Sequence, residues 1–287
     1  MAEEISAALV MKLRQMSGQG MMDCKKAIAE AKGNLDEAMA ILRKKGLATL
    51  AKRAERDTKE GKVICQTSGN GKIVAMAALG CETDFVANSE DFKAAAAVLG
   101  DYALACASDS GVDNLAETFL NGKKFSQIIT DAVSKTGEKM QVCDYARYAL
   151  GGNGLIGTYI HFNNKVGTML EVETSNAAVA EAVKTVVSEI AMHIAAIKPM
   201  SLDRTGVDPA LIAKEREIAA DQVKNKPANI IDKIVDGKMN KFLSDICLIE
   251  QPFVKDDSKT VRQALDDAAK KAGGQATIKR FVRFEIG

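Results

Sequence analysis

Cys81-Glu82-Thr83-Asp84-Phe85-Val86 is the stretch at which an apolar run, beginning at Ile73, gives way to a helix. Ser89 is a typical N-cap residue, so we predict that the helix begins directly after it. The stretch is therefore a strand-to-helix loop, and it sets a carboxylate beside a phenyl ring. Loops on a rigid scaffold often carry function, which favours a partner contact here. The alternative, in which Phe85 packs into the core and Asp84 caps a turn, stays open at this point.

The composition is that of a globular protein with sizeable cores. The chain has 287 residues, of which 47% are hydrophobic and 27% charged, and its formal net charge is +1. This balance argues against a large electrostatic surface for nucleic acid or an anionic membrane. No apolar segment approaches the ~20 residues of a membrane span, and the acidic N-terminus lacks the basic start of a signal peptide.

The six cysteines are scattered and form no Cys-x-x-Cys motif. They are typical of buried thiols in a reducing compartment, so we expect a cytoplasmic protein without a disulfide or zinc framework.

The N-terminal region predicts three short helices over residues 5–46, with breaks at Gly18-Gln19-Gly20 and Gly33-Asn34 and an end at Gly46. Residues 51–60 form a helix-favouring connector of mixed charge, which indicates a solvated face. We predict a helical domain with its connector over residues 1–54.

A strand–turn–strand–helix plan then occurs twice, which predicts two related α+β subdomains with antiparallel sheets over 55–150 and 151–287. The elements predicted for the first are strands over 62–66 and 72–79, a loop over 82–88, helices over 89–106 and 112–136, and a strand over 140–150. Asn70-Gly71 supplies its hairpin turn. The second begins with strands over 155–162 and 166–172 around Asn163-Asn164, followed by one long helix capped near Asn176.

The second subdomain also contains a predicted antiparallel helical hairpin over about 207–245, which we expect to protrude. Asp208-Pro209 is an N-cap with a first-turn proline, and Asn225-Lys226-Pro227 turns the chain. The remaining elements are predicted to be an extended segment over 246–254, a helix over 260–272 and a strand over 276–286.

Motifs for catalysis or metal binding are weak. Gly152-Asn153-Gly154-Leu155-Ile156-Gly157 has the spacing of a dinucleotide fingerprint, but it leads into a strand where that motif must open a helix. Two histidines, His161 and His193, have no neighbours at metal-ligand spacing. A catalytic pair of a histidine with a cysteine or a serine stays an open alternative, although no sequence signature supports it. We interpret His193 as a buried helix residue and His161, near a hairpin tip, as a candidate contact.

Five segments together resemble the translation elongation factor Ts family. They are Gly20-Met21-Met22-Asp23-Cys24-Lys25-Lys26-Ala27, Glu82-Thr83-Asp84-Phe85-Val86-Ala87, Ala191-Met192-His193-Ile194-Ala195, the segment from Lys226-Pro227 to Lys238, and Gln251-Pro252-Phe253-Val254-Lys255. The resemblance implies a ubiquitin-associated-like N-terminal domain, a core of two α+β subdomains, and a guanine-nucleotide exchange factor for elongation factor Tu. It implies no cofactor, no metal, no covalent chemistry of the chain's own and no direct contact with nucleic acid or membrane.

The resemblance also assigns contact residues. Thr83, Asp84, Phe85 and Val86 match the loop that pushes against the GTPase and displaces its magnesium. Met21 and Met22 match an N-terminal contact, and His161 matches a histidine of the core contact.

Two departures from the family pattern bear on these contacts. Thr136 stands where members can carry isoleucine, and the sequence ends at Gly287, before a C-terminal helix found in some members. Two other classes of function stay open: a small-molecule enzyme that uses the glycine-rich turn at 151–157, and an RNA-binding protein, which the near-neutral charge disfavours.

Overall fold

The computed structural model describes residues 6–287, apart from the side chains of Ala228 and Asn229; the predicted start of the first helix at residue 5 lies outside this range. The α+β class is confirmed. The chain divides into two compact units. The first runs to Tyr148 and also includes Ile160–Gly167 and Phe284–Gly287. The second consists of Ala149–Tyr159 and Thr168–Arg283. The division into three domains stays a prediction. None of the described helices is long and apolar enough to cross a membrane.

Three helices open the first unit, as predicted. They are α1 (Ala7–Ser17), α2 (Met21–Glu30) and α3 (Leu35–Lys52). The predicted end of the third helix at Gly46 is wrong, because α3 continues through this glycine to Lys52. A Cβ atom at Gly46 would lie 2.5 Å from the carbonyl oxygen of Thr130. The glycine is therefore needed for close packing between two helices and does not end α3.

The first repeat of the α+β plan follows α3. Its elements are β1 (Glu60–Thr67), β2 (Ile73–Cys81), α4 (Asp84–Ala87), α5 (Glu90–Ala105), α6 (Val112–Glu117), α7 (Phe125–Thr136) and β5 (Met140–Ala149). The sheet has the order β1-β2-β5, and β1 pairs antiparallel with β2. Its core joins β2 and β5 to α5 and α7 through buried residues such as Leu79, Phe92 and Val133.

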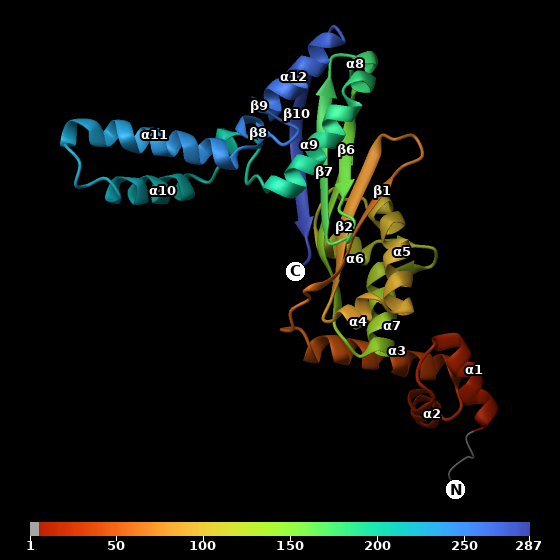
Figure 1. Cartoon of the computed structure of the whole chain (residues 1–287). Helices are drawn as coiled ribbons and strands as arrows, with labels where there is room; N and C mark the ends of the chain where they lie inside the picture. Colours follow the sequence, from red (N-terminus) through yellow and green to blue (C-terminus); the bar gives the residue numbers. More distant parts are fainter. Residues whose placement is uncertain (1–5) are drawn as a thin grey trace. The chain divides into compact units, whose positions relative to one another are not determined.

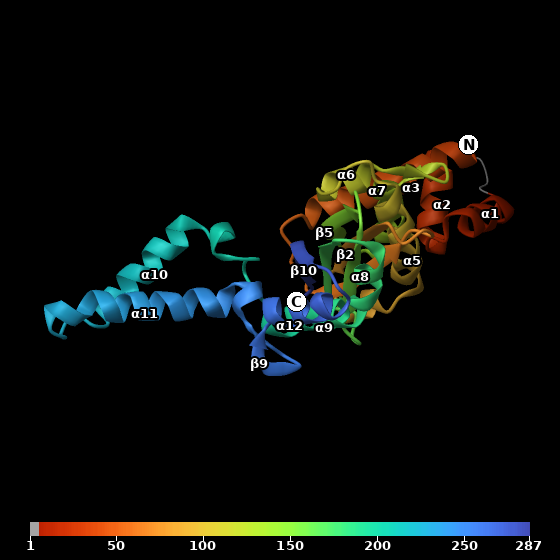
Figure 2. The same ribbon diagram turned by 90° about the horizontal axis from the view of Figure 1, so that it is seen from above.

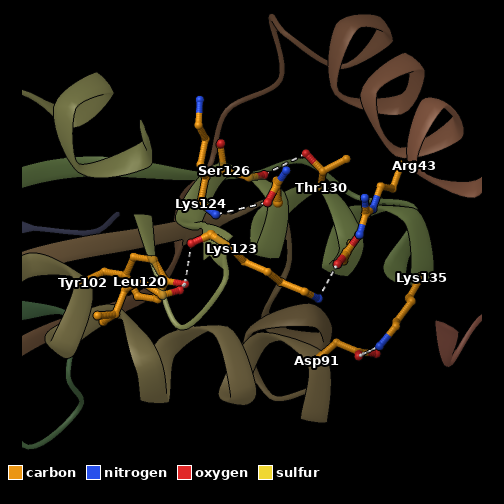
Figure 3. A network of polar contacts seen from close by, with 11 residues as sticks. Arg43, Asp91, Tyr102, Leu120, Lys123, Lys124, Ser126, Thr130 and Lys135 are labelled. Atoms are coloured by element: carbon orange, nitrogen blue, oxygen red, sulfur yellow. Dashed lines mark hydrogen bonds and ion pairs between the residues drawn. The ribbon is translucent and has the colours of Figure 1, made fainter. Parts of the chain in front are cut away.

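A small hairpin interrupts the helix predicted over 112–136. Its strands are β3 (Phe119–Leu120) and β4 (Lys123–Lys124), which pair antiparallel around Asn121 and Gly122. Both turn residues have positive φ, at 51° and 81°, as the tightest hairpin turns require. The Tyr102 hydroxyl donates to the carbonyl oxygens of Leu120 and Lys123 at 2.7 and 3.0 Å and so fixes the hairpin to α5 (Figure 3).

The second repeat has the same strand order as the first. Its elements are β6 (Gly154–Ile160), β7 (Val166–Thr174), α8 (Ala177–Ala182), α9 (Lys184–Ile197), α12 (Val261–Lys271) and β10 (Ala276–Glu285), with the sheet order β10-β7-β6. In each sheet the second hairpin strand is central and the last strand of the repeat lies beside it. The single long helix predicted after Asn176 is divided into α8 and α9 at Val183.

Between α9 and α12 the second repeat carries the predicted helical hairpin, formed by α10 (Pro209–Asp221) and α11 (Ala228–Ile246). Figures 1 and 2 both show these helices side by side and antiparallel, extending away from the β10-β7-β6 sheet of their own unit. Val223, Val235 and Met239 are buried in a cluster that belongs to the hairpin alone. The hairpin therefore has a small core of its own.

The segment predicted to be extended over 246–254 is only partly so. α11 reaches Ile246, and a 3-10 turn over Leu248–Glu250 comes before the short strands β8 (Pro252–Phe253) and β9 (Asp256–Thr260). An earlier 3-10 turn, over Arg204–Gly206, precedes α10. The turn at 248–250 places Leu248 in the core of the second repeat.

Candidate functional site

The strand-to-helix segment after β2 forms a one-turn helix, α4, where the sequence predicts a loop. Phe85 lies on its outer side, and 83% of the residue is exposed to solvent. Asp84 is exposed beside it, and one of its carboxylate oxygens accepts from the backbone N–H of Phe85 at 3.0 Å. The interpretation in which Phe85 packs into the core is wrong. The two side chains together form a small surface with an acidic and an aromatic part.

The inner side of α4 is fixed to the first repeat. Thr83 is the N-cap, and its Oγ1 accepts from the backbone N–H of Val86 at 3.3 Å. Val86 and Ala87 are buried against the core of the repeat. The four residues predicted to act together therefore divide by role: Asp84 and Phe85 face solvent, whereas Thr83 and Val86 hold them there.

Two carboxylates that sequence reasoning did not select support this segment. The Thr83 hydroxyl donates to Oε1 and Oε2 of Glu138 at 3.0 and 2.9 Å. The Glu82 carboxylate accepts from the Arg53 guanidinium and from the backbone N–H of Lys139, each at 2.7 Å. Burial opposes ionisation of Glu82, but these two donors outweigh it and lower the pKa of the carboxyl.

Cys81, directly before this segment, is fully buried and donates its S–H to the Thr83 carbonyl oxygen at 3.3 Å. Burial, followed by the negative charge of Glu138, raises the pKa of the Cys81 thiol to about 12. A thiol with this pKa stays protonated at neutral pH, which excludes Cys81 as a nucleophile there.

Met21 and Met22 are exposed at the start of α2, as a contact role requires. The same helix buries Cys24, Ala27 and Ile28 against α1 and α3. Exposed methionines on a fixed helix are flexible, polarizable side chains that suit an adaptable contact surface.

The three N-terminal helices, of which α2 carries these methionines, are fixed to the first repeat through α3. The Ser134 hydroxyl on α7 donates to the carbonyl oxygen of Leu42 on α3 at 3.0 Å. Figure 3 shows Arg43 of α3 beside α7, where it pairs with Asp131 at 3.8 Å. In the same view Lys135 of α7 pairs with Asp91 of α5 at 2.8 Å. These contacts link α3, α7 and α5 in one network.

His161 follows β6 in the turn toward β7. Its backbone N–H donates to the Val166 carbonyl oxygen at 2.9 Å, and its ring lies 4.4 Å from that of Phe162, centroid to centroid. Phe162 is 87% exposed and was not selected from the sequence, although an aromatic residue beside the Asn163-Asn164 turn is a usable signal. The backbone N–H of Val63 in β1 donates to the Asn164 carbonyl oxygen at 2.7 Å and steadies this turn.

His193 is fully buried on α9, as predicted, with both ring nitrogens satisfied. Its Nε2 lies 2.9 Å from Oε1 of Gln251, and its Nδ1 accepts from the backbone N–H of Val254 at 3.2 Å. The glycine-rich turn leads into β6 at Gly154, so no helix N-terminus stands there to receive a phosphate. Among the residues that the structure describes, no three His, Cys, Asp or Glu side chains gather as a metal site.

The predicted contact residues thus occupy three places on the first unit: α4 with its cap, the start of α2, and the turn between β6 and β7. A family model described as Elongation factor TS matches residues 82–287, which is more than half of the chain.

Full-length relatives give the same result. Elongation factor Ts of a Nitratiruptor species is 41% identical over 285 residues, which cover 99% of this chain and 93% of that protein. The protein of the same name from Desulfovibrio desulfuricans is 39% identical over 287 residues, or 98% of each chain. That of Clostridioides difficile is 40% identical over 288 residues, covering 99% of this chain and 93% of the relative. The chain therefore belongs to the elongation factor Ts family, a family of translation elongation factors.

Proposed function

We propose that the chain is a guanine-nucleotide exchange factor that binds elongation factor Tu in its GDP-bound and nucleotide-free states and promotes release of GDP. The observation that supports this most directly is the exposed Phe85 beside Asp84 on a short helix with a fixed inner side. Exchange of this kind needs no covalent chemistry, because the factor acts by binding the empty GTPase better than the loaded one. Nucleotide and factor then weaken each other's binding by the same ratio.

The energy required is within reach of a few side chains. A thousandfold faster release of GDP needs a barrier lowered by about 4 kcal/mol. Burying one phenyl ring contributes roughly 1.5–3 kcal/mol, so Phe85 could supply much of this if the GTPase covers it only when the nucleotide pocket is distorted. The Phe85 ring is exposed to solvent in the free protein, so the free energy of burying it is gained only when a partner covers it.

Asp84 would act on the magnesium ion of the GTPase. Mg²⁺ takes oxygen ligands in a strict octahedral geometry, so a carboxylate brought near its site can disturb the coordination on which GDP binding depends. Thr83 and Val86 hold Asp84 and Phe85 in place. Met21, Met22 and His161 are proposed as further contacts with the GTPase, and all three lie on the same unit as α4.

The decisive experiment is to mix the chain with elongation factor Tu that is loaded with a fluorescent GDP and to follow the fluorescence in a stopped-flow instrument. We expect release that accelerates with the concentration of the chain, and a nucleotide-free complex that survives size-exclusion chromatography. Release at the spontaneous rate over all concentrations would falsify the proposal.

A further inference from the structure

The contacts beneath α4 form a polar network that joins three segments far apart in the sequence. Glu82 and Thr83 directly follow β2, Glu138 and Lys139 belong to the turn between α7 and β5, and Arg53 directly follows α3. The ammonium group of Lys139 also donates to the carbonyl oxygens of Ala54 and Arg56, at 2.6 and 3.0 Å. The connector after α3, the α7–β5 turn and the segment that carries Phe85 are thus bonded to one another.

A helix of one turn does not hold its own shape, since forming the first turn of a helix is unfavourable and α4 has only four residues to offset that cost. Its geometry must come from its cap and from the burial of Val86 and Ala87. The cap depends in turn on how the single hydroxyl proton of Thr83 is used, because that proton must point away from the Val86 N–H and leave one of the two oxygen lone pairs facing it.

Glu138 determines that use. An ionised carboxylate only accepts hydrogen bonds, so the Thr83 hydroxyl must donate to it, and a lone pair of the hydroxyl oxygen is left to accept from the Val86 N–H. Glu82 acts one residue earlier, where its two charge-assisted bonds to Arg53 and Lys139 fix the backbone that leads into the cap. We propose that Glu82 and Glu138 are positioning residues for nucleotide exchange, which hold α4 so that Asp84 and Phe85 face outward and which tie it to the connector of the N-terminal helices. This inference rests on the proposed exchange function.

The first test uses GDP release with three variants. Glu138→Ala removes the acceptor of the Thr83 hydroxyl. We expect the rate of GDP release at a saturating concentration of the exchange protein to fall by about tenfold, which is a typical consequence of losing a hydrogen bond to a charged group. The concentration of chain at half-saturation should change much less, because Phe85 remains available for binding. Glu138→Gln keeps an acceptor oxygen and should restore most of the rate.

The matched control is Glu90→Gln. Like Glu138→Ala, this variant removes one negative charge close to α4. Glu90, however, lies exposed on the first turn of α5, where it pairs with Lys93. We expect wild-type release. Equal rates for Glu138→Ala and Glu90→Gln, with an active wild type, would overturn the inference. So would a Glu138→Gln rate as low as that of Glu138→Ala.

The second test needs no GTPase and therefore separates failure of the inference from failure of the proposed function. Hydrogen–deuterium exchange of the free chain should show faster exchange for peptides over residues 84–89 in Glu138→Ala, and also in Glu82→Ala. Peptides from the middle of α5 around Phe92 should keep their protection, which excludes a general loss of folding. Unchanged protection over residues 84–89 in both variants would refute the positioning role, whether or not the wild-type protein accelerates GDP release from the GTPase.

Discussion

The two repeats place a short helix at the same point of the same plan, but they present different side chains on it. In the first repeat Thr83 caps α4 and Val86 is buried beneath it. In the second repeat Asn176 caps α8, its Oδ1 accepting from the N–H of the buried Val179 at 3.0 Å. The two positions after the cap are Asp84-Phe85 in α4 and the exposed pair 177–178, both alanine, in α8.

The comparison shows that the architecture alone does not produce a contact surface. A carboxylate and a phenyl ring stand on one copy of the plan, and two methyl groups stand at the matching positions of the other. Function belongs to side chains placed on a fold that can exist without them.

The largest effect is expected from Phe85→Ala, which makes α4 resemble α8. Removal of an exposed ring should leave the free energy of unfolding nearly unchanged. GDP release at a saturating concentration of the variant should slow roughly 10- to 100-fold, as the free energy of burying the ring implies. Stopped-flow release and chemical denaturation measure the two quantities. An unchanged release rate would remove Phe85 from the mechanism.

A smaller effect is expected from removing the helical hairpin, through which we expect the second repeat to contact the GTPase. Residues 207–245 would be replaced by a short glycine–serine linker. Because the hairpin has its own buried cluster, the remainder of the second repeat should stay folded, although Gln251 loses the Asp245 carbonyl oxygen as an acceptor. The affinity for nucleotide-free elongation factor Tu should fall about tenfold, which corresponds to ~1.4 kcal/mol. Equal affinities in calorimetric titrations would argue against a contact by the hairpin.

The repeats should also differ in their response to acid. Burial lowers the pKa of His193 below its ordinary value of 6.5, although the bond to Gln251 opposes the shift. The unfolded chain then binds the proton more readily than the folded one, so the contribution of His193 is complete above pH 6.5 and is lost as the pH falls through 6.5 toward the lowered pKa. The pKa of the Glu82 carboxyl is lowered from 4.5, so its contribution is complete above pH 4.5 and is lost only as the pH falls from 4.5 toward the lowered pKa.

We therefore expect α9 to lose hydrogen-exchange protection on acidification before β2 does, after correction for the intrinsic exchange rate. His161→Gln is the control, since the chain has only two histidines and this variant leaves His193 in place. Loss of protection in β2 first, or abolition of the effect by His161→Gln, would contradict the assignment.

The smallest change is expected from a graft. Ala177→Asp and Ala178→Phe, introduced together into the Phe85→Ala protein, would give α8 the acid–aromatic pair of wild-type α4, whose ring that protein lacks. We expect GDP release to stay at the rate of the Phe85→Ala protein, because a contact pair also has to face the nucleotide pocket of the GTPase. Recovery toward the wild-type rate would show that the two repeats are interchangeable.

Sequence patterns predicted the repeated plan because its signals are local. Asn70-Gly71 and Asn163-Asn164 mark the two hairpin turns, and apolar runs mark the strands on either side of them. The burial of His193 was also predicted correctly, whereas the residues around Phe85 left its burial open and only the family resemblance implied an exposed ring. Asn121-Gly122 carries the same turn signal, but its two-residue strands are too short to show an alternating pattern, so the sequence predicts a continuous helix there.

The supports of α4 could not be found in this way. Thr83 and Glu138 are 55 residues apart, and nothing in the sequence around either residue indicates the other. The continuation of α3 through Gly46 has a similar cause, because the contact that requires a glycine lies on α7. Contacts of this kind follow from tertiary packing, which overrides local helix propensity.

The solvated ring of Phe85 also has a kinetic consequence. Since the phenyl group faces solvent in the free protein, we expect that no opening step has to precede an encounter. Association with the GTPase should then follow a single exponential whose observed rate rises linearly with concentration, without a lag, until the rearrangement of the GTPase itself becomes limiting.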